Sequence, residues 1–301
     1  MAKVVKRGQR ECFVSRDGWA IVSVDYDACE MRTWAQCCLW ILGYSDLASI
    51  LNNPKRCPHV EMGCRLRGLF NSAGSGWEEQ YAAGYALKKS DATAYKALRG
   101  LAKGPNFGLP GGMAWERLMD YCRLNYGVTI SKEEAVLACA VWRQIYREAQ
   151  PYLDWVKTQV GNRFGSRGTI KQFVSQRIRG NVGFTDGANG FFQGLAADIA
   201  KDAGWRLVEQ AYEVKSSALY GCRPLAFVHD EWLYECPLDQ IHEAGYLMAK
   251  IMTETAMEYC PDVLFTAAPA AMLRWSKEAG DPYFDENGKL IVFEQRKVVA
   301  A

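Results

Sequence analysis

The chain has 301 residues, of which 49% are hydrophobic and 23% charged, and its formal net charge is +2. This composition is typical of a folded globular protein and too apolar for a disordered one. No apolar run reaches the roughly 18 residues that a membrane-spanning helix requires, and the basic start of the chain has no apolar segment behind it. The near-neutral charge gives no global indication of a nucleic-acid partner, so such a function must rest on local patches.

The eleven cysteines are scattered along the chain and form no C-x-x-C pair. In a chain of this length, such a pattern is typical of free thiols in a reducing compartment.

The sequence predicts one strand followed by helices in the first half of the chain. Ala20–Tyr26 is short, apolar and β-branched, which predicts a buried strand. A long helical pattern covers Trp77–Lys103, and the run Gly104–Gly112 with its two prolines is expected to interrupt it. Ser131–Val160 is helical again and opens with a capping-box sequence.

The second half mixes helices with hairpins. Gly161–Gly183 is rich in glycine and arginine and is expected to form a loop, and a helix should follow over Ala188–Lys215. Pro224–Tyr234 predicts two short strands joined at His229-Asp230-Glu231. A helix over Pro237–Cys260 and a hairpin around Asn287-Gly288 complete the chain.

Two carboxylates stand at the ends of predicted strands. Asp25 closes the first strand, and Asp230 lies at a hairpin tip beside Glu231. Taken singly, Asp25 is explained by helix capping and Asp230 by ordinary turn composition. Together, two such carboxylates can bind two Mg²⁺ ions about 3.5–4 Å apart, an arrangement used for phosphoryl transfer. The pair therefore predicts a phosphate-bearing substrate.

A cationic helix face is the third feature. Arg99 and Lys103 are four residues apart, so a helix places them on one face, and Phe107 extends that face. Like charges at this spacing destabilise an isolated helix, and a bound polyanion reverses the effect. A solvated basic face with Phe107 in the core is the plainer interpretation.

Four segments carry a family resemblance, and they occur in the family's order. They are Val24–Arg32, Arg99–Gly108, Asn189–Ile199 and Val228–Glu231. They resemble, respectively, motif A, motif B, the segment before motif C, and motif C of family A DNA polymerases, the bacterial DNA polymerase I type. The similarity covers roughly Lys6 to Phe293.

The resemblance implies a role for each matched residue. Asp25 and Asp230 would hold two Mg²⁺ ions (Mn²⁺ being the alternative), with Glu231 beside them, and Lys103 would donate a proton to the leaving pyrophosphate. The residues implied to bind the incoming deoxynucleotide are Arg99, Lys103, Phe107, Glu30, His59 and Tyr26. Those implied to contact primer-template DNA are His229, Gln193, Asn189, Arg177 and Arg179.

The chain also departs from the family pattern. Gly111 stands where motif B usually has a second aromatic residue, and Pro105 and Pro110 are expected to interrupt the motif B helix. Thr185 replaces an arginine that contacts the primer, for which Arg177 or Arg179 would compensate.

The implied fold is α+β, a right-hand polymerase with an antiparallel palm sheet and inserted helical fingers. The palm is expected at residues 1–53 and 183–301, and the fingers at residues 54–182. Motif A lies close to the start of the chain, which predicts a polymerase without a thumb or a 3′→5′ exonuclease domain. We expect a minimal or split polymerase, of a phage-like kind, in the cytoplasm of a bacterial or phage-infected cell.

The function predicted from the resemblance is template-directed DNA synthesis by two-metal nucleotidyl transfer from deoxynucleotides to a primer 3′-OH. Its expected partners are primer-template DNA, deoxynucleotides and a separate polypeptide that supplies thumb or exonuclease function, with no membrane. The alternative is a non-catalytic subunit that binds primer-template DNA in a replication complex. A zinc site at Cys57, His59 and Cys64 fits the usual ligand spacing poorly. The basic stretch Arg163–Arg179 is either a solvated loop or a DNA contact.

Overall fold

The computed structural model describes residues 8–71, 74, 76–161, 165–279 and 282–293. Its contacts divide the chain into two units. The sheet unit comprises Met1–Cys29, Ala197–Tyr259 and Phe265–Ala301, and the helical unit comprises Glu30–Ala196 and Cys260–Leu264. Along the chain, helix α9 (Phe184–Tyr212) begins in the helical unit and ends in the sheet unit.

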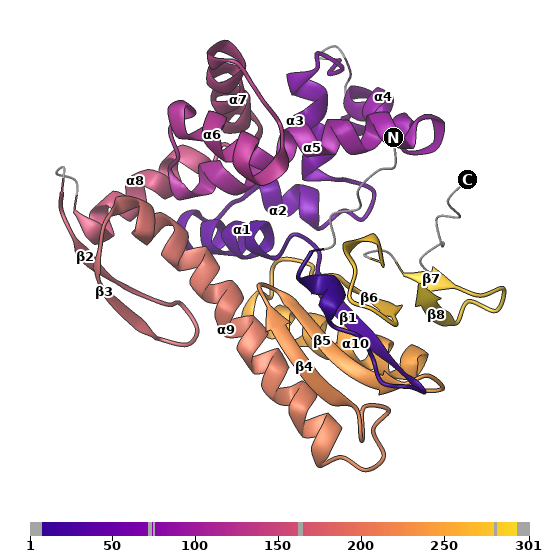
Figure 1. Cartoon of the computed structure of the whole chain (residues 1–301). Coiled ribbons are helices and arrows are strands. Elements are labelled where there is room, and N and C mark those ends of the chain that lie inside the picture. Colours follow the sequence, from indigo (N-terminus) through magenta and orange to yellow (C-terminus); the bar gives the residue numbers. More distant parts are fainter. Residues whose placement is uncertain (1–7, 72–73, 75, 162–164, 280–281, 294–301) are drawn as a thin grey trace. The chain divides into compact units, whose positions relative to one another are not determined.

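The sheet unit is built on a six-stranded sheet with the order β4-β5-β1-β6-β8-β7 (Figure 1). Its strands are β1 (Trp19–Tyr26), β4 (Arg223–Val228), β5 (Glu231–Pro237), β6 (Ala267–Met272), β7 (Tyr283–Phe284) and β8 (Leu290–Phe293). All neighbouring strands are antiparallel except β6 and β8, which are parallel. The predicted α+β class with an antiparallel sheet is therefore confirmed, with one parallel pairing.

The two faces of this sheet have different coverings. Helix α10 (Ile241–Tyr259) packs so closely on one face that a Cβ at Gly245 would lie 2.9 Å from Pro269. The second half of α9 covers the same face, where Trp232 donates a 3.0 Å hydrogen bond to the carbonyl of Ala200. Side chains alternate along a strand, so Ile21 and Leu233 belong to the opposite face and its apolar cluster.

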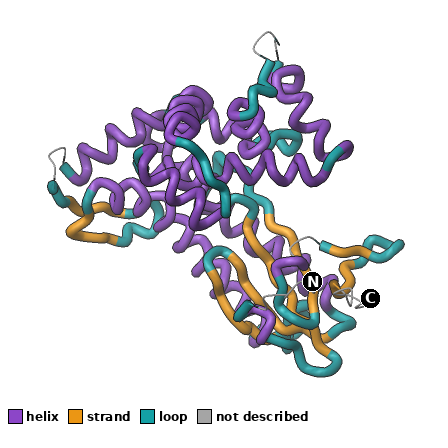
Figure 2. The backbone as a smooth tube through the Cα atoms, turned by 45° about the horizontal axis from the view of Figure 1, so that its top comes forward, coloured by secondary structure: helices purple, strands orange, loops and turns teal. Residues whose placement is uncertain are grey.

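The helical unit consists of helices and one small hairpin (Figure 2). Its helices are α1 (Cys29–Leu42), α2 (Asp46–Leu51), α3 (Pro58–Leu66), α4 (Trp77–Ser90), α5 (Ala92–Gly108), α6 (Trp115–Tyr126), α7 (Lys132–Ile145), α8 (Ala149–Val160) and the first half of α9. Four fully buried aromatic side chains from α1, α7, α8 and the connection before α8 form its core. They are Trp34, Trp142, Tyr146 and Tyr152, and Trp34 contacts the other three rings.

Short 3-10 turns complete the assignment: η1 (Arg10–Cys12) and η3 (Lys277–Ala279) in the sheet unit, and η2 (Leu109–Gly111) in the helical unit. None of the helices in the described residues is long and apolar enough to cross a membrane.

Two long helical predictions were too long. The stretch Trp77–Lys103 divides into α4 and α5 at Asp91, because the Asp91 carboxylate caps α5 by accepting hydrogen bonds from the amides of Thr93 and Ala94. The stretch after Ser131 likewise divides into α7 and α8, and the predicted capping box at Ser131 is present.

Pro105 does not interrupt the helix as expected. Helix α5 runs through it to Gly108 and continues as η2, in which Pro110 occupies the first turn. Pro105 has no amide hydrogen, so α5 lacks one helical hydrogen bond there but keeps its helical backbone.

The segment expected as a loop after α8 forms a hairpin of β2 (Gly168–Lys171) and β3 (Ile178–Val182). Phe173, between the two strands, contacts Trp155 of α8 and Phe191 of α9. These ring contacts fix a segment whose glycine-rich sequence carries little strand signal. Arg163, named above in the basic stretch, lies outside the described residues.

Candidate active site

The sheet unit brings Asp25 and Asp230 together. Asp25 is the penultimate residue of β1. Asp230 is the second residue of the two-residue turn between β4 and β5. The register pairs Asp25 with Glu231, the residue after Asp230. The chain bends sharply at both places: Ala28 has φ 53 and His229 has φ 60. Left-handed backbone in a non-glycine residue is strained and is common at functional sites.

The two carboxylates perturb each other. The pKa of Asp25 is raised to about 7, first because neighbouring protein atoms displace water from it and then because Asp230 lies against it. Asp25 still keeps an exposed edge. The pKa of Asp230 is also raised, with burial as the main cause. A pair of carboxylates that holds a proton at neutral pH is a site that a cation would stabilise.

Glu231 is held in place by three donors. Its Oε1 accepts hydrogen bonds from Ser23 Oγ at 2.5 Å and Trp275 Nε1 at 3.1 Å, and its Oε2 pairs with Arg10 Nη1 at 3.2 Å. Arg10 and Trp275 are far from Glu231 in the sequence and could not be found from the motif. In this arrangement Glu231 anchors the turn that presents Asp230.

The donor set fits Mg²⁺ better than a soft metal. Carboxylate oxygens are hard ligands, and Mg²⁺ is commonly held by one or two carboxylates together with water and substrate phosphate. Within the described residues, no group of three or more His, Cys, Asp or Glu side chains is arranged to enclose a metal. An ion at Asp25 and Asp230 would need further oxygen ligands such as water or a phosphate.

Tyr26 is placed differently from the other predicted nucleotide-binding residues. Its side chain is buried in the sheet unit, and its hydroxyl donates a 2.9 Å hydrogen bond to the carbonyl of Met252. Only its main chain is left for the predicted nucleotide contact.

The helical unit presents the cationic face on α5. Arg99, Lys103 and Phe107 follow one another at four-residue spacing within this helix, and all three are half-buried. The Nε atom of Arg99 is buried without a hydrogen-bond partner, and in the described part of the chain neither cation forms an ion pair. The Arg99 guanidinium lies over the Tyr95 ring, 5.9 Å from the ring centre, and its buried, unpaired Nε–H is suited to an anionic ligand.

His59 belongs to the same neighbourhood. Its ring lies 5.4 Å from that of Phe107, and its Nδ1 is 3.0 Å from Nδ2 of Asn106. Because an amide nitrogen only donates, Nδ1 accepts and Nε2 carries the ring proton in neutral histidine. Asn106 was not found from the sequence, although it immediately precedes Phe107.

Two further predicted residues meet where α1 and α9 approach each other. Gln193 Nε2 donates to Glu30 Oε1 at 3.2 Å. Asn189 lies one turn earlier on α9, and its side chain occupies the space beside Gly111, where an added Cβ would be 2.5 Å from it. The missing aromatic residue at position 111 is thus replaced by the amide of Asn189.

Of the two arginines predicted to contact DNA, Arg179 lies on β3 and Arg177 immediately precedes it. Arg177 and Arg179 are both exposed, and Arg177 Nη2 donates to the carbonyl of Gly194 on α9 at 3.2 Å. His229 is exposed beside Asp230 in the sheet unit. Each unit therefore holds one group of predicted residues.

Comparison with known families decides the identity of the fold. The model of DNA polymerase family A matches residues 80–275, about two thirds of the chain. The chain belongs to DNA polymerase family A. The match includes three of the four segments named above, and the fourth, around Asp25, lies before it.

Curated relatives of this family A chain are bacterial DNA polymerases I. That of Aquifex aeolicus (strain VF5) is 28% identical over 201 residues, covering 66% of this chain and 33% of the relative. That of Deinococcus radiodurans is 26% identical over 254 residues, covering 81% of this chain and 22% of the relative. The family A chain thus spans a third or less of these relatives.

A solved structure agrees with the fold. The POL domain of Pol1 from M. smegmatis, in complex with DNA primer-template and dNTP, superposes with a TM-score of 0.60 at 20% identity. The superposition covers 91% of this chain and 44% of that chain. It supports a polymerase fold for the family A chain, with its palm-like sheet and inserted helices.

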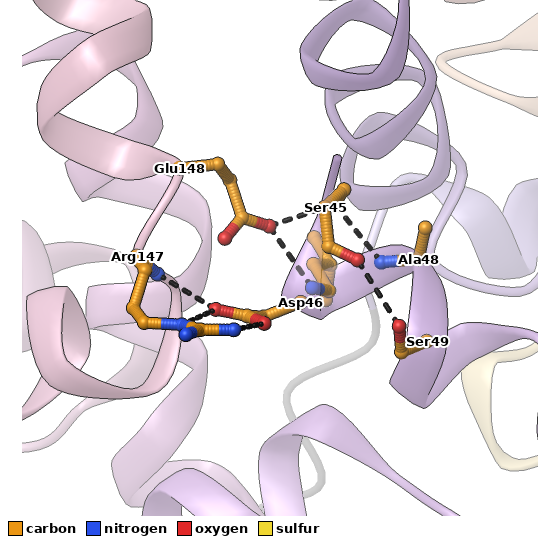
Figure 3. A network of polar contacts seen from close by, with 7 residues as sticks. Ser45, Asp46, Ala48, Ser49, Arg147 and Glu148 are labelled. Carbon is orange, nitrogen blue, oxygen red and sulfur yellow. Dashed lines mark hydrogen bonds and ion pairs between the residues drawn. The ribbon is translucent and has the colours of Figure 1, made fainter. Parts of the chain in front are cut away.

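A groove in the described part of the helical unit contains none of the predicted residues. It has a volume of about 860 Å³ and is lined by residues that include Tyr44, Asp46 and Arg147. Figure 3 shows Asp46 paired with Arg147, and Glu148 accepting from Ser45 Oγ at 2.7 Å. Glu148 is fully buried and its Oε2 has no partner. This network joins α2 to the start of α8 in the family A chain.

Proposed function

We propose that the chain catalyses template-directed DNA synthesis, in which a primer 3′-OH attacks the α-phosphorus of a deoxynucleoside triphosphate. The observation that carries the proposal is the paired carboxylates Asp25 and Asp230 at the sheet edge, in a chain that belongs to DNA polymerase family A. The sheet unit would act as the palm, predicted at residues 1–53 and 183–301. Residues 54–182 would form the fingers.

Asp25 and Asp230 would bind two Mg²⁺ ions, with Mn²⁺ as a substitute. When bound, these ions make the primer hydroxyl more acidic and neutralise charge on the phosphates. The protein contributes rigid placement, because Asp25 ends a buried strand and Glu231 fixes the hairpin turn through Ser23, Trp275 and Arg10.

The cationic face of α5 would bind the triphosphate. Arg99 and Lys103 supply positive charge, and the unpartnered Nε of Arg99 offers a buried donor to a phosphate oxygen. Lys103 would also protonate the leaving pyrophosphate. Phe107 would stack on the nucleotide, and His59, with Nδ1 held by Asn106, would direct Nε2–H toward the phosphates. In the sheet unit, the main chain of Tyr26 is also proposed to contact the nucleotide.

Selectivity and DNA contacts are assigned to the α1–α9 region and the hairpins. Glu30, positioned by Gln193, would exclude a ribose 2′-OH. Gln193 and Asn189 would reach the minor groove, where acceptors are alike for every correct pair. His229 would lie near the primer terminus. Exposed Arg177 and Arg179 would contact phosphates.

We also propose a split arrangement, in which a second polypeptide supplies further contacts to the duplex. A formal net charge of +2 supports this, because it is small for a protein that holds a polyanion alone. Co-purification from the source cell, followed by extension with and without the captured partner, tests it. A partner that leaves extension length unchanged would contradict the arrangement.

The deciding experiment is extension of a primed DNA template with Mg²⁺ and deoxynucleotides. Asp230→Asn should lower the rate by about a thousandfold or more, because a metal-assisted step loses several kcal/mol of stabilisation. Asp239→Asn, which changes an exposed aspartate of the same unit, is the matched control and should extend normally. If wild-type protein binds primer-template DNA yet never extends it, the alternative of a non-catalytic binding subunit replaces the proposal.

A further inference from the structure

A pair of cysteines lies at the open end of the hairpin that carries Asp230. Strands β4 and β5 pair from Val228 and Glu231 at the turn to Arg223 and Glu235, and the next position on each side is Cys222 and Cys236. Directly opposite residues in an antiparallel pair have Cα atoms about 4.5–5.5 Å apart. This lies within the roughly 4.4–6.8 Å that a disulfide spans.

The two side chains face each other. Both cysteines are fully buried, and Cys222 Sγ also lies 3.9 Å from the carbonyl oxygen of Ala218. The interaction between the two thiols lowers the pKa of Cys222 and raises the pKa of Cys236. The backbone of Cys222 is fixed as well, since its amide donates to the carbonyl of Leu219 at 2.9 Å. The two thiols therefore interact, and the pKa of Cys222 is lower than that of Cys236.

We propose that Cys222 and Cys236 form a redox-active dithiol that a hydroperoxide converts to a disulfide, closing the base of the β4–β5 hairpin. Cys222 is the attacking sulfur and Cys236 the resolving one. This site stands apart from the proposed polymerase chemistry, so its test does not depend on that activity.

The reaction balances in two steps. The Cys222 thiolate attacks one peroxide oxygen, the O–O bond breaks, and Cys222 becomes a sulfenic acid as hydroxide leaves. Cys236 then gives up its proton and attacks the Cys222 sulfur, which forms the S–S bond and releases water. Two thiols are oxidised by two electrons, and one hydrogen peroxide is reduced to two waters once the hydroxide takes up the proton that Cys222 lost.

Cys37 and Cys38 serve as comparison thiols for oxidation within the same chain. Cys37 and Cys38 are also fully buried, but burial raises the pKa of both thiols, and adjacent residues of one helix point to different sides. They should stay reduced under conditions that oxidise Cys222.

The sequence makes the product easy to detect. Trypsin cuts after Lys215 and Lys250 and spares Arg223, because Pro224 follows it. Cys222 and Cys236 are thus the two cysteines of a single peptide, residues 216–250. The disulfide lowers the mass of this peptide by two hydrogen atoms and blocks both sites from alkylation.

The test treats the folded, reduced full chain with hydrogen peroxide, removes the oxidant with catalase, and alkylates in denaturant before digestion. We expect the unalkylated, two-hydrogen-lighter peptide to form roughly tenfold faster than Cys37 loses its thiol. Dithiothreitol should reverse it. Cys222→Ala and Cys236→Ala should each abolish the cross-link, and Cys37→Ala should keep it.

Circular dichroism of the two alanine variants checks that they fold. If the folded wild-type peptide still takes two alkyl groups after peroxide, or gains oxygen atoms at separate sulfurs, the dithiol assignment is wrong.

Discussion

Lys103 has two separable duties in the proposed chemistry, charge and proton donation. Arginine keeps the positive charge but holds its proton too tightly to act as a general acid. Lys103→Arg should therefore lower kcat for nucleotide incorporation by about a hundredfold or more, while KM for the deoxynucleotide changes only a few fold.

Lys96→Arg, on the exposed side of the same helix, is the control for this substitution and should leave both constants unchanged. Rapid-quench measurement of single-nucleotide incorporation separates the two constants. An unchanged kcat in Lys103→Arg would remove lysine from the role of acid.

Glu148 makes stability depend on pH. Burial raises its pKa above the usual 4.5, although hydrogen bonds from Leu47 and Ser45 act in the opposite direction. The folded chain therefore keeps a proton that the unfolded chain has lost, and stability falls as pH rises from about 4.5 through the folded pKa. Glutamine keeps the Oε1 acceptor and removes the charge. Glu148→Gln should raise the thermal midpoint by a few degrees at pH 8 and change it little at pH 4.

Thermal unfolding at both pH values measures this effect. Glu213→Gln, an exposed site, serves as the control. A midpoint below that of the wild type at pH 8 would mean that the ionised carboxylate is stabilising in the Ser45 network.

At the scale of elements, α5 and α6 touch through a glycine. An added Cβ at Gly104 would lie 2.3 Å from Cys122 Sγ, so Gly104→Ala should destabilise the fold by about 1–3 kcal/mol. Adding Cys122→Ala removes the obstructing sulfur, and the double variant should recover at least about 1 kcal/mol relative to the sum of the single changes.

Gly100→Ala is the matched control on the same helix, because nothing lies within 4 Å of its added Cβ. It should be neutral or stabilising by up to about 1 kcal/mol. Urea unfolding of the four variants gives the free energies of unfolding, and additivity within error would show that the helices can move apart at this point.

Elements with strong local signals could be predicted from the sequence, and elements defined by distant contacts could not. The β-branched run before Asp25 and the turn at Asp230 indicated β1 and the β4–β5 hairpin. The break at Asp91 was missed because its surroundings are uniformly helical in pattern, and a single side-chain cap ends one helix and starts the next.

The same division applies to the candidate site. Motif spacing pointed to Asp25, Arg99 and Lys103, whose roles are still predictions. No local pattern could have shown that Arg10 pairs with Glu231, 221 residues away. The β2–β3 hairpin depends in the same way on Phe173 finding rings in α8 and α9.

At the scale of the whole molecule, the carboxylate pair should couple folding stability to Mg²⁺. Because the pKa of Asp25 is about 7 in the folded chain against 3.8 in the unfolded chain, stability should fall as pH rises between these values. A bound cation offsets the repulsion between the ionised carboxylates. Millimolar Mg²⁺ should therefore raise the thermal midpoint at pH 8 and have little effect at pH 5.

Differential scanning fluorimetry in chelator and in Mg²⁺ checks this expectation. Asp25→Asn should raise the midpoint in chelator at pH 8 and lose the Mg²⁺ response, and Asp239→Asn should behave as wild type. If Mg²⁺ shifted the thermal midpoint equally at pH 5 and pH 8, the cation would bind at a site other than Asp25 and Asp230.

The left-handed backbone at His229 bears on how this position can diverge among related chains. Glycine, asparagine and aspartate adopt φ near 60 at modest cost, whereas valine, isoleucine and threonine do so poorly because their Cβ is branched. Backbone conformation therefore restricts which residues fit at position 229, whatever chemical role the side chain has. The geometry of this turn therefore limits the residues that position 229 can hold, independently of the contact proposed for His229 with the primer.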